Sequence, residues 1–467
     1  MAFNLVSRRN KKTVPVNLVT KADLERSLAG WGETAKNWAE ATGFDASANK
    51  HCILPGQDGT PARVLLGIDE GARLDLWAFA GLQEKLPQGR YEIETELLAG
   101  DATRAALGWA LATYRFDRYK KMEAAKAELV WPGNADRAFV EHATEGTFLA
   151  RDLINIPGSD LRPTELEAAA KKLAKAHKAK FSVIRGEELL KKNYPAIHAV
   201  GRGADDAPRL IDFSWGEADA PKVTLVGKGV CFDTGGYDIK PAGGMLHMKK
   251  DMGGSAHVLA LASMIMNAGL NVRLRVLIPA VMNMISGNAF LPKDILSTRK
   301  GTSVEVGNTD AEGRLILCDA LYEACAEKPE FILDYATLTG AARVALGADV
   351  PALFCNDDDT ANAFQAHGEA EQDPLWRLPL HQPYTKQLKT KIADISSTGS
   401  GGHGGAITAA LFLEHFIESG IKWAHIDLMA YNGKDRPGRP EGGEAMTIRA
   451  AYRLIETRFA SARAKSV

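Results

Sequence analysis

The chain has 467 residues, of which 45% are hydrophobic and 25% charged, so it can bury a large core in two or three domains and is neither disordered nor collagen-like. Lys and Arg total 57 while Asp and Glu total 58, which gives a formal net charge of −1. This balance argues against a protein dedicated to nucleic-acid binding.

The first part of the chain, 1–135, predicts a small N-terminal α/β domain that we do not expect to supply catalytic residues. Short apolar runs such as Ala62–Ile68 alternate with loops, and a helical pattern covers Ala102–Lys121. After a Trp-Pro-Gly break, a second helical run extends over about Asp136–Leu153. We interpret 136–160 as a connecting helix and linker.

The remaining chain, 161–467, alternates between strand and helix patterns. Strands are predicted over Val223–Phe232, Val272–Val281, Phe331–Ala336 and Trp423–Leu428, and helices over Glu165–His177, Ser255–Asn267, Arg314–Ala326, Ala406–Ile417 and Thr447–Arg458. Such alternation is typical of an α/β fold. We predict a mixed, largely parallel sheet with helices on both faces and an active site at the carboxyl ends of its strands.

The cellular setting follows from what the sequence lacks. The cysteines are scattered and form no CxxC pair, which indicates reduced thiols. No segment approaches the roughly 18 apolar residues of a membrane span, and the basic N-terminus has no apolar signal-peptide core. We therefore expect a soluble, cytoplasmic protein without a membrane partner.

A first polar cluster begins at the end of the strand predicted at 223–232. It contains Lys228, Asp233, Lys240 and Asp251, framed by pairs of glycines. Glycines allow the backbone to approach a small ligand closely. Two carboxylates and two ammonium groups are therefore expected to converge. We give no role to Lys250, and we interpret its neighbour Lys249 as solvent exposed.

A second cluster is the sequence NTDAEGRL, in which Asp310, Glu312 and Arg314 recur at every second position. Extended backbone places all three on one side, whereas a helix would turn Glu312 to the far face. We favour the extended form because the alternating residues Val304–Val306 precede the cluster.

The carboxylates of Asp233, Asp251, Asp310 and Glu312 would repel one another if they met without compensating charge. Two divalent cations bridged by carboxylates are the usual solution in hydrolytic enzymes. Oxygen ligands suit Mn²⁺ or Mg²⁺, and Zn²⁺ is tolerated.

Together these motifs resemble a known family. NTDAEGRL resembles the signature of the leucine aminopeptidase (cytosol aminopeptidase) family of two-metal peptidases, and GKGVCFDTGG, DIKP and MKKDMGG match it in order and spacing. The resemblance covers about 150–460. It implies an enzyme that hydrolyses the N-terminal residue from peptides and dipeptides and assembles as a homohexamer of two trimers.

The resemblance also implies the ligands of two metal ions per subunit, Mn²⁺ or Zn²⁺. Asp233 and Glu312 would bridge both ions, Lys228 and Asp251 would complete the tighter site, and Asp310 the exchangeable one. Only a neutral lysine has a free lone pair. The ions and burial would therefore have to lower the pKa of Lys228 far below its ordinary value of about 10.4.

Two further residues would act on the substrate. Lys240 would polarise the scissile carbonyl and stabilise the gem-diolate, and Arg314 would hold a bicarbonate ion that takes the proton of a metal-bridging water. Asp238, which stands where smaller residues are common, could tune Lys240.

The pocket for the first side chain would be lined by Met248, Thr337, Gly340, Met429 and Asn432. Met429 and Asn432 stand where the family has a small and an apolar residue, which weakens the expectation of a plain leucine preference.

Two other functions stay open. One is a non-catalytic DNA-binding or architectural role, against which the near-zero net charge weighs. The other is a different two-metal hydrolase such as a phosphoesterase, against which the lysine ligand weighs. A glycine loop at Gly399–Gly404 fits GxGxxG, but no clear strand precedes it, so we interpret it as a loop beside the active site.

Overall fold

The computed structural model describes residues 3–460, which form two compact units. One unit contains residues up to Thr144 together with 434–441, and the other contains 145–433 and the chain from Gly442 onward. The first unit therefore continues past the predicted boundary at 135. It also includes 434–441, which we had assigned to the C-terminal domain because contacts made far along the chain leave no local pattern.

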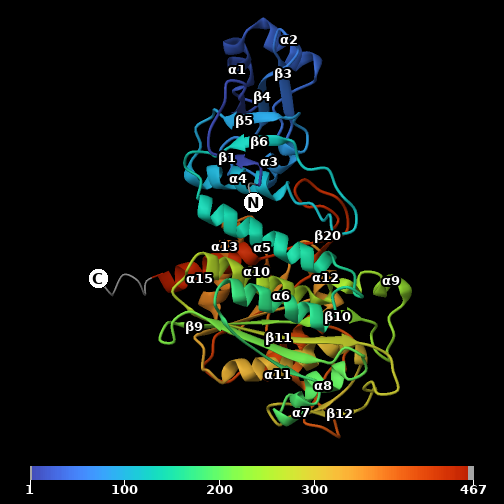
Figure 1. The fold of residues 1–467 in the computed structure, drawn as a ribbon. Helices are drawn as coiled ribbons and strands as arrows, with labels where there is room; N and C mark the ends of the chain where they lie inside the picture. The colour runs from blue at the N-terminus through green and yellow to red at the C-terminus, as the bar shows by residue number, and fades with distance from the viewer. Residues whose placement is uncertain (1–2, 461–467) are drawn as a thin grey trace. The chain divides into compact units, whose positions relative to one another are not determined.

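The first unit contains a six-stranded sheet in the order β1-β6-β5-β2-β4-β3, parallel except for the β3–β4 pair (Figure 1). Its strands are β1 Leu5–Val6, β2 Val14–Val19, β3 His51–Pro55, β4 Pro61–Gly67, β5 Gly89–Ile93 and β6 Ala127–Val130. Its helices are α1 Leu24–Trp31, α2 Glu33–Ala41, α3 Leu76–Gln83 and α4 Ala99–Leu111. Helix α5, Arg137–Asn155, contains the boundary between the units.

The helix predicted over Ala102–Lys121 is too long, because α4 ends at Leu111. The Arg115 guanidinium donates to the carbonyl oxygens of Ala112 (2.8 Å) and Tyr114 (2.6 Å) just beyond this end. Such bonds satisfy carbonyl groups that a continuing helix would otherwise use.

The second unit is built on a mixed, largely parallel sheet, as predicted. Its main path runs β16-β15-β18-β14-β9-β11-β8-β7, and β10 pairs with β11. The strands are β7 Lys180–Arg185, β8 Arg209–Trp215, β9 Lys222–Gly227, β10 Gly229–Asp233, β11 Arg273–Asn283, β14 Phe331–Ala336, β15 Ala352–Cys355, β16 Trp376–Arg377 and β18 Trp423–Asp427. The central strands β9, β11, β14 and β18 are parallel, whereas β7, β8 and β15 form antiparallel pairs.

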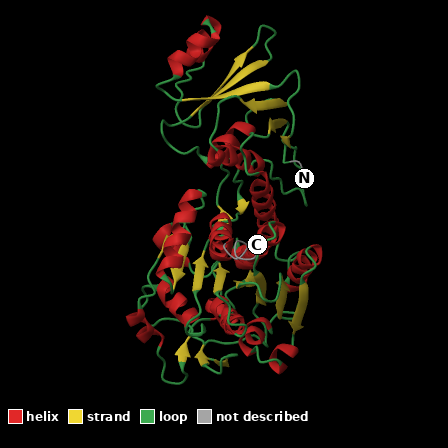
Figure 2. Ribbon diagram, turned by 90° about the vertical axis from the view of Figure 1, so that its left-hand side faces the viewer, coloured by secondary structure: helices red, strands yellow, loops and turns green. Residues whose placement is uncertain are grey.

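Helices cover both faces of this sheet, which the apolar composition of its central strands requires. Helices α10, α15 and α6 lie on one face and α11 and α8 on the other (Figure 1), and Figure 2 shows the strands between helical layers. The helices are α6 Pro163–Ala176, α7 Glu188–Lys191, α8 Pro195–Gly201, α9 Ala242–Met245, α10 Gly253–Asn267, α11 Glu312–Cys325, α12 Gly340–Leu346, α13 Asp358–Ala370, α14 Gly405–Glu414 and α15 Ile448–Phe459.

Short elements complete the second unit. The 3₁₀ turns are η1 Met248–Met252, η2 Thr309–Ala311 and η3 Gln382–Leu388. One small sheet has the order β12 Ile295–Ser297, β13 Ser303–Glu305 and β17 Ile395–Ser396. A second small sheet pairs β19 Tyr431–Asn432 with β20 Gly442–Gly443. The strand predicted over Val223–Phe232 is in fact two strands, β9 and β10, which separate at Lys228.

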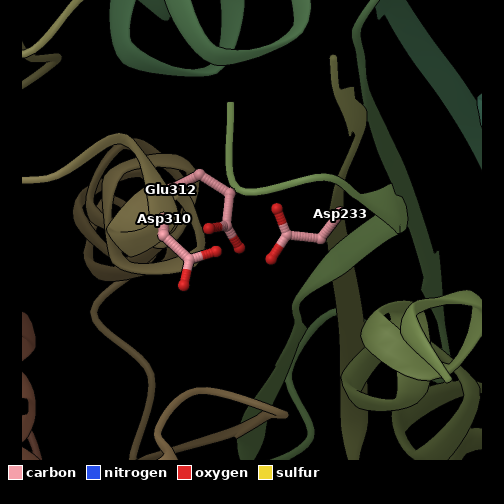
Figure 3. Close-up of side chains that lie close together, drawn as sticks. All are labelled: Asp233, Asp310 and Glu312. Atoms are coloured by element: carbon pink, nitrogen blue, oxygen red, sulfur yellow. The ribbon is translucent and has the colours of Figure 1, made fainter. Parts of the chain in front are cut away.

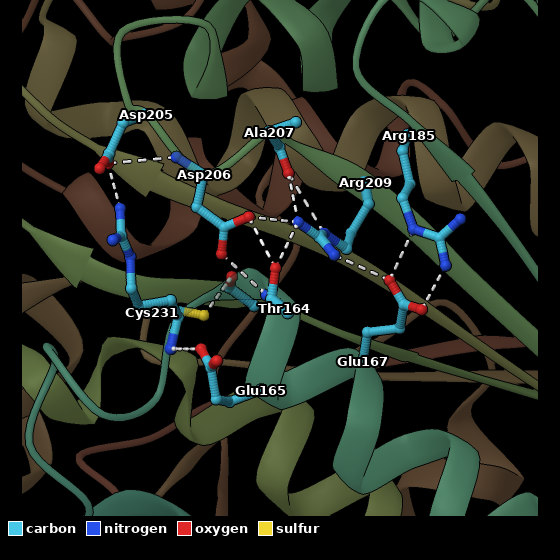
Figure 4. A network of polar contacts seen from close by, with 11 residues as sticks. Thr164, Glu165, Glu167, Arg185, Asp205, Asp206, Ala207, Arg209 and Cys231 are labelled. Carbon is cyan, nitrogen blue, oxygen red and sulfur yellow. Dashed lines mark hydrogen bonds and ion pairs between the residues drawn. The ribbon is translucent and has the colours of Figure 1, made fainter.

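An ion-pair network at the β7–β8 edge joins this sheet to α6 (Figure 4). Arg209 Nη1 donates to Glu167 Oε2 at 2.8 Å, and Arg185 Nε donates to the same oxygen at 2.8 Å. These bonds satisfy Glu167, which is largely buried on α6. The network is structural, since charges in a partly buried place need partners.

Among the described residues, no helix is both long enough and apolar enough to cross a membrane.

Candidate active site

A cavity of about 330 Å³ opens in the second unit where the central parallel strands end. All predicted site residues except Glu312 and Asn432 line it: Lys228, Asp233, Lys240, Met248, Asp251, Asp310, Arg314, Thr337, Gly340 and Met429. Lys228 follows β9, Thr337 follows β14, and Asp427 ends β18. The cavity thus lies at the carboxyl ends of the strands, where ligand sites of α/β sheets form.

Three carboxylates meet on one side of this cavity. Asp233 ends β10, Asp310 lies in η2, and Glu312 begins α11. One oxygen from each lies within 4.8 Å of the others, and Figure 3 shows Asp233 facing the other two across a small gap. Asp233 and Glu312 are almost fully buried, so their mutual repulsion is poorly screened.

The predicted extended form of NTDAEGRL is wrong. The Asn308 side chain accepts a hydrogen bond from the Asp310 N–H (2.7 Å) and caps η2, and α11 begins directly afterwards at Glu312. The residue between them, Ala311, has φ −106° and ψ 34°, so the helical path is interrupted there. This interruption brings Asp310 and Glu312 to the same point, which one continuous helix could not do.

Lys228 connects these carboxylates to Asp251. Its Nζ lies 2.7 Å from Asp251 Oδ2, 2.8 Å from Glu312 Oε1 and 3.0 Å from the Thr337 carbonyl oxygen. Burial alone would lower the pKa of Lys228, but Asp251 and Glu312 raise it above its ordinary value. A ligand role for the neutral amine therefore needs nearby cations that reverse this shift.

A glycine makes this arrangement possible. A Cβ on Gly313 would lie 2.6 Å from Lys228 Cε, so any larger residue would displace the lysine. Gly313, which follows Glu312 in the motif NTDAEGRL, is therefore needed to leave room for Lys228 of the first cluster.

The donor set fits divalent cations. Burial raises the pKa of Glu312, and Asp233 adds to that shift; burial and Asp251 raise the pKa of Asp233. Glu312 Oε2 is buried and has no hydrogen-bond donor among the described residues. Divalent-cation sites are built from carboxylate oxygens of this kind, which are buried close together and lack hydrogen-bond donors.

Lys240 pairs with the other two carboxylates of the site. Its Nζ is 2.9 Å from Asp233 Oδ2 and forms a second ion pair with Asp310. Burial opposes its charge, but Asp233 and Asp310 raise the pKa of Lys240, so it stays cationic.

Asp238 forms hydrogen bonds with Thr309. Asp238 Oδ2 accepts a hydrogen bond from the Thr309 N–H (2.7 Å), and the Asp238 N–H donates to Thr309 Oγ1 (2.8 Å). We call this reciprocal pair the Asp238–Thr309 clasp. It joins the loop that carries Lys240 to the turn that carries Asp310.

Arg314 presents a buried guanidinium to the cavity. Its Nη1 donates to the Ser397 carbonyl oxygen (2.7 Å), and among the described residues it forms no ion pair with a carboxylate. Its Nε is buried without a hydrogen-bond acceptor in the described chain, and burial lowers the pKa of Arg314 to about 10. A bound anion would satisfy this group.

Four of the five residues predicted to contact the first side chain of the substrate line the cavity. Met248, Thr337, Gly340 and Met429 line the cavity, and Thr337 Oγ1 donates to Asp251 Oδ1 (2.8 Å). Asn432 is not among the lining residues. Its Nδ2 donates to Glu444 Oε2 (2.7 Å) in the buried interior.

Sequence reasoning gave no role to three charged residues that line this cavity: Lys250, Arg343 and Asp427. Lys250 is only 4% exposed, and burial lowers its pKa to about 8. Asp427 Oδ1 accepts the N–H groups of Leu338 and Thr339 (3.0 Å each), which positions the cavity wall after β14. For Lys250 the only available signal was its position inside the motif MKKDMGG.

Comparison with known proteins agrees with this geometry. Residues 148–452 match the catalytic domain of the cytosol aminopeptidase family, and residues 14–132 match the M17 aminopeptidase N-terminal domain. The probable cytosol aminopeptidase of Brucella anthropi is 39% identical over 97% of both chains. Peptidase B of Pectobacterium atrosepticum is 40% identical over 70% of this chain and 78% of its own.

Solved structures agree as well. The crystal structure of the cytosol aminopeptidase from Coxiella burnetii superposes with a TM-score of 0.94 at 45% identity, covering 98% of this chain and 99% of the other. The bottromycin maturation enzyme BotP in complex with Mn gives a TM-score of 0.86 at 30% identity, covering 96% and 99%. The predicted resemblance is confirmed: the chain belongs to the cytosol aminopeptidase (M17) family of metal-dependent peptidases, and it is a hydrolase with aminopeptidase function.

Proposed function

We propose that this protein removes the N-terminal residue from peptides and dipeptides with the help of two divalent cations, Mn²⁺ or Zn²⁺. The observation that carries the proposal is the convergence of Asp233, Asp310 and Glu312 with two lysines and Arg314 at one cavity. The complex of BotP with Mn supports manganese as one of the metals.

The ligands of the proposed metal site are the residues that converge in the second unit. Asp233 and Glu312 would contribute to both ions, Lys228 and Asp251 to one, and Asp310 to the other. Two such cations supply a water activated as a nucleophile at neutral pH. Binding of the cations would offset the burial and the carboxylate repulsion that raise the pKa values of Asp233 and Glu312.

The protein's own side chains would bind and polarise the peptide. Asp251 would accept the free α-amine of the substrate, which restricts cleavage to the first residue. Lys240 would donate to the scissile carbonyl oxygen and stabilise the negative charge that develops there. Arg314 would hold bicarbonate as a proton acceptor, because its buried Nε has no acceptor within the described chain.

We further propose a cytoplasmic location and a homohexamer made of two trimers. The location is supported by the relatives that carry the name cytosol aminopeptidase. Measurement of the mass of the native particle in solution tests the assembly, and a monomer at micromolar concentration would contradict it.

The activity is tested with aminoacyl-p-nitroanilides and dipeptides, with Mn²⁺ or Zn²⁺ and with a chelator. We expect release of the first residue that the chelator abolishes and added metal restores. Glu312→Gln keeps the shape of the side chain, so it should fold but bind less metal and lose turnover. Full turnover by this variant would contradict the proposal. Hydrolysis of p-nitrophenyl phosphate or salt-dependent DNA binding, without peptide hydrolysis, would favour the other two functions.

A further inference from the structure

The first unit contains the tip of a hairpin whose two strands belong to the second unit. Residues 434–441 group with the first unit, whereas β19 and β20, which flank them in the chain, group with the second. At the tip, the backbone groups of Arg436 and Arg439 exchange two hydrogen bonds (2.9 and 2.8 Å) around Pro437 and Gly438. Proline followed by a glycine with φ +63° is typical of a tight β-turn.

One side of α3 receives this tip. Four residues at its positions i, i+3, i+4 and i+7 share that side: Trp77, Ala80, Gly81 and Glu84. The Arg439 guanidinium carbon lies 4.2 Å from the centre of the Trp77 ring, and the Gly438 N–H donates to Glu84 Oε1 (3.2 Å). A Cβ on Gly438 would lie 2.8 Å from Ala80 Cβ, so this close approach requires glycine at 438.

The base of the hairpin is joined to η1 from both of its strands. In β19, the ring centre of Tyr431 lies 4.7 Å from that of His247, the residue before η1. In β20, the Gly443 N–H donates to Asn155 Oδ1 (2.7 Å), and Lys249 of η1 donates to the carbonyl oxygen of the same asparagine (2.8 Å). A shift of the hairpin therefore acts on η1 through two separate contacts.

The turn η1 carries Asp251, the residue proposed above to bind one cation and the substrate amine. A 3₁₀ turn of five residues is held only weakly by its own hydrogen bonds, so its position depends on what packs against it. We propose that α3 positions η1 through the hairpin, so that the first unit supports the reaction without supplying a catalytic residue. The expected effect on turnover rests on the proposed function, because it acts through Asp251.

The test compares Gly438→Val with Gly433→Ala, a matched control in the same hairpin whose Cβ would have no atom of the described residues within 4 Å. Valine at 438 would collide with Ala80 and would have to adopt left-handed backbone, so the tip should leave α3. We expect kcat of the metal-loaded, folded Gly438→Val protein on leucyl-p-nitroanilide to fall about five- to tenfold, the result of a displacement below about 1 Å. Gly433→Ala should keep the wild-type kcat.

Hydrogen exchange distinguishes a positioning role from a loss of overall stability. The amides of 247–252 should exchange faster in Gly438→Val than in the wild-type protein or in Gly433→Ala, whereas the amides of β9 should keep their wild-type rates. Faster exchange by the same factor in η1 and in β9 would show general destabilisation and would overturn the inference.

A second pair of variants applies if Gly438→Val does not fold. Glu84 is exposed, so Glu84→Ala should fold while removing the acceptor of the Gly438 N–H. We expect its kcat to fall about two- to threefold, the scale of one exposed hydrogen bond. Glu84→Gln, whose amide oxygen can still accept, should restore kcat. Equal values of kcat in both variants would contradict the proposed role of α3.

The outcomes separate this inference from the proposed function. If the wild-type protein hydrolyses leucyl-p-nitroanilide and Gly438→Val has the same kcat or the same exchange at 247–252, the inference is wrong and the aminopeptidase function stands. If the wild-type protein hydrolyses no peptide substrate with either metal, the proposed function is wrong. Exchange at 247–252 then decides by itself whether α3 positions η1.

Discussion

The Asp238–Thr309 clasp should control how precisely Lys240 and Asp310 face each other. Thr309 is fully buried, and its N–H has Asp238 Oδ2 as acceptor at 2.7 Å. In Asp238→Ala this N–H loses its acceptor, which costs about 1–3 kcal/mol when the group is buried. Because Asp238 itself is exposed, water can partly replace its carboxylate. We therefore expect the free energy of unfolding to fall by about 1–2 kcal/mol and the Tm by a few °C.

The kinetic effect should exceed the loss of stability at the assay temperature. Lys240 now lies 2.9 Å from Asp233 and also pairs with Asp310, and a displacement of about 1 Å can cost up to a hundredfold in rate. We expect kcat on leucyl-p-nitroanilide to fall about tenfold and Mn²⁺ to bind less tightly, as measured by calorimetry.

Asp238→Asn is the matched control, because its amide oxygen can still accept the Thr309 N–H while the charge is removed. It should keep most of the stability and of kcat. If Asp238→Ala has wild-type Tm and kcat, the clasp is unimportant. If Asp238→Asn is as impaired as Asp238→Ala, the negative charge rather than the hydrogen bond is what matters.

Three further outcomes are expected. Lys240→Ala should lower kcat by about 10²–10³-fold, the scale of one lost oxyanion donor, and a change confined to KM would contradict that role. Gly254→Ala should fail to fold because its Cβ would lie 2.1 Å from the Tyr335 carbonyl oxygen, whereas Gly243→Ala, with nothing within 4 Å, should express normally. Burial lowers the pKa of His257 to about 4, so its neutral ring contributes fully to stability above pH ~6.5. The free energy of unfolding should fall by about 3 kcal/mol as the pH is lowered from there toward 4. An NMR titration that places the ring near its ordinary pKa would refute this last prediction.

The sequence alone determined the parts of the molecule that depend on local patterns. The strand predicted at Phe331–Ala336 is β14 residue for residue, because a short, largely apolar run suits a strand covered on both faces. The fold class and the family followed in the same way. The residues now gathered at the cavity were identifiable because their types and spacing are preserved in short, contiguous motifs.

Tertiary structure decided how those motifs meet. NTDAEGRL is a 3₁₀ turn joined to a helix, because Asn308 caps the turn and α11 packs against the sheet. The burial of Lys250 could not be deduced, since its neighbour Lys249 has the same side chain and is less buried. Only packing distinguishes the two: one side chain lines the cavity, and the other reaches the Asn155 carbonyl oxygen. The amino-acid sequence specifies which side chains are available, but the solvation of these side chains and the distances between them depend on contacts between segments far apart in the chain.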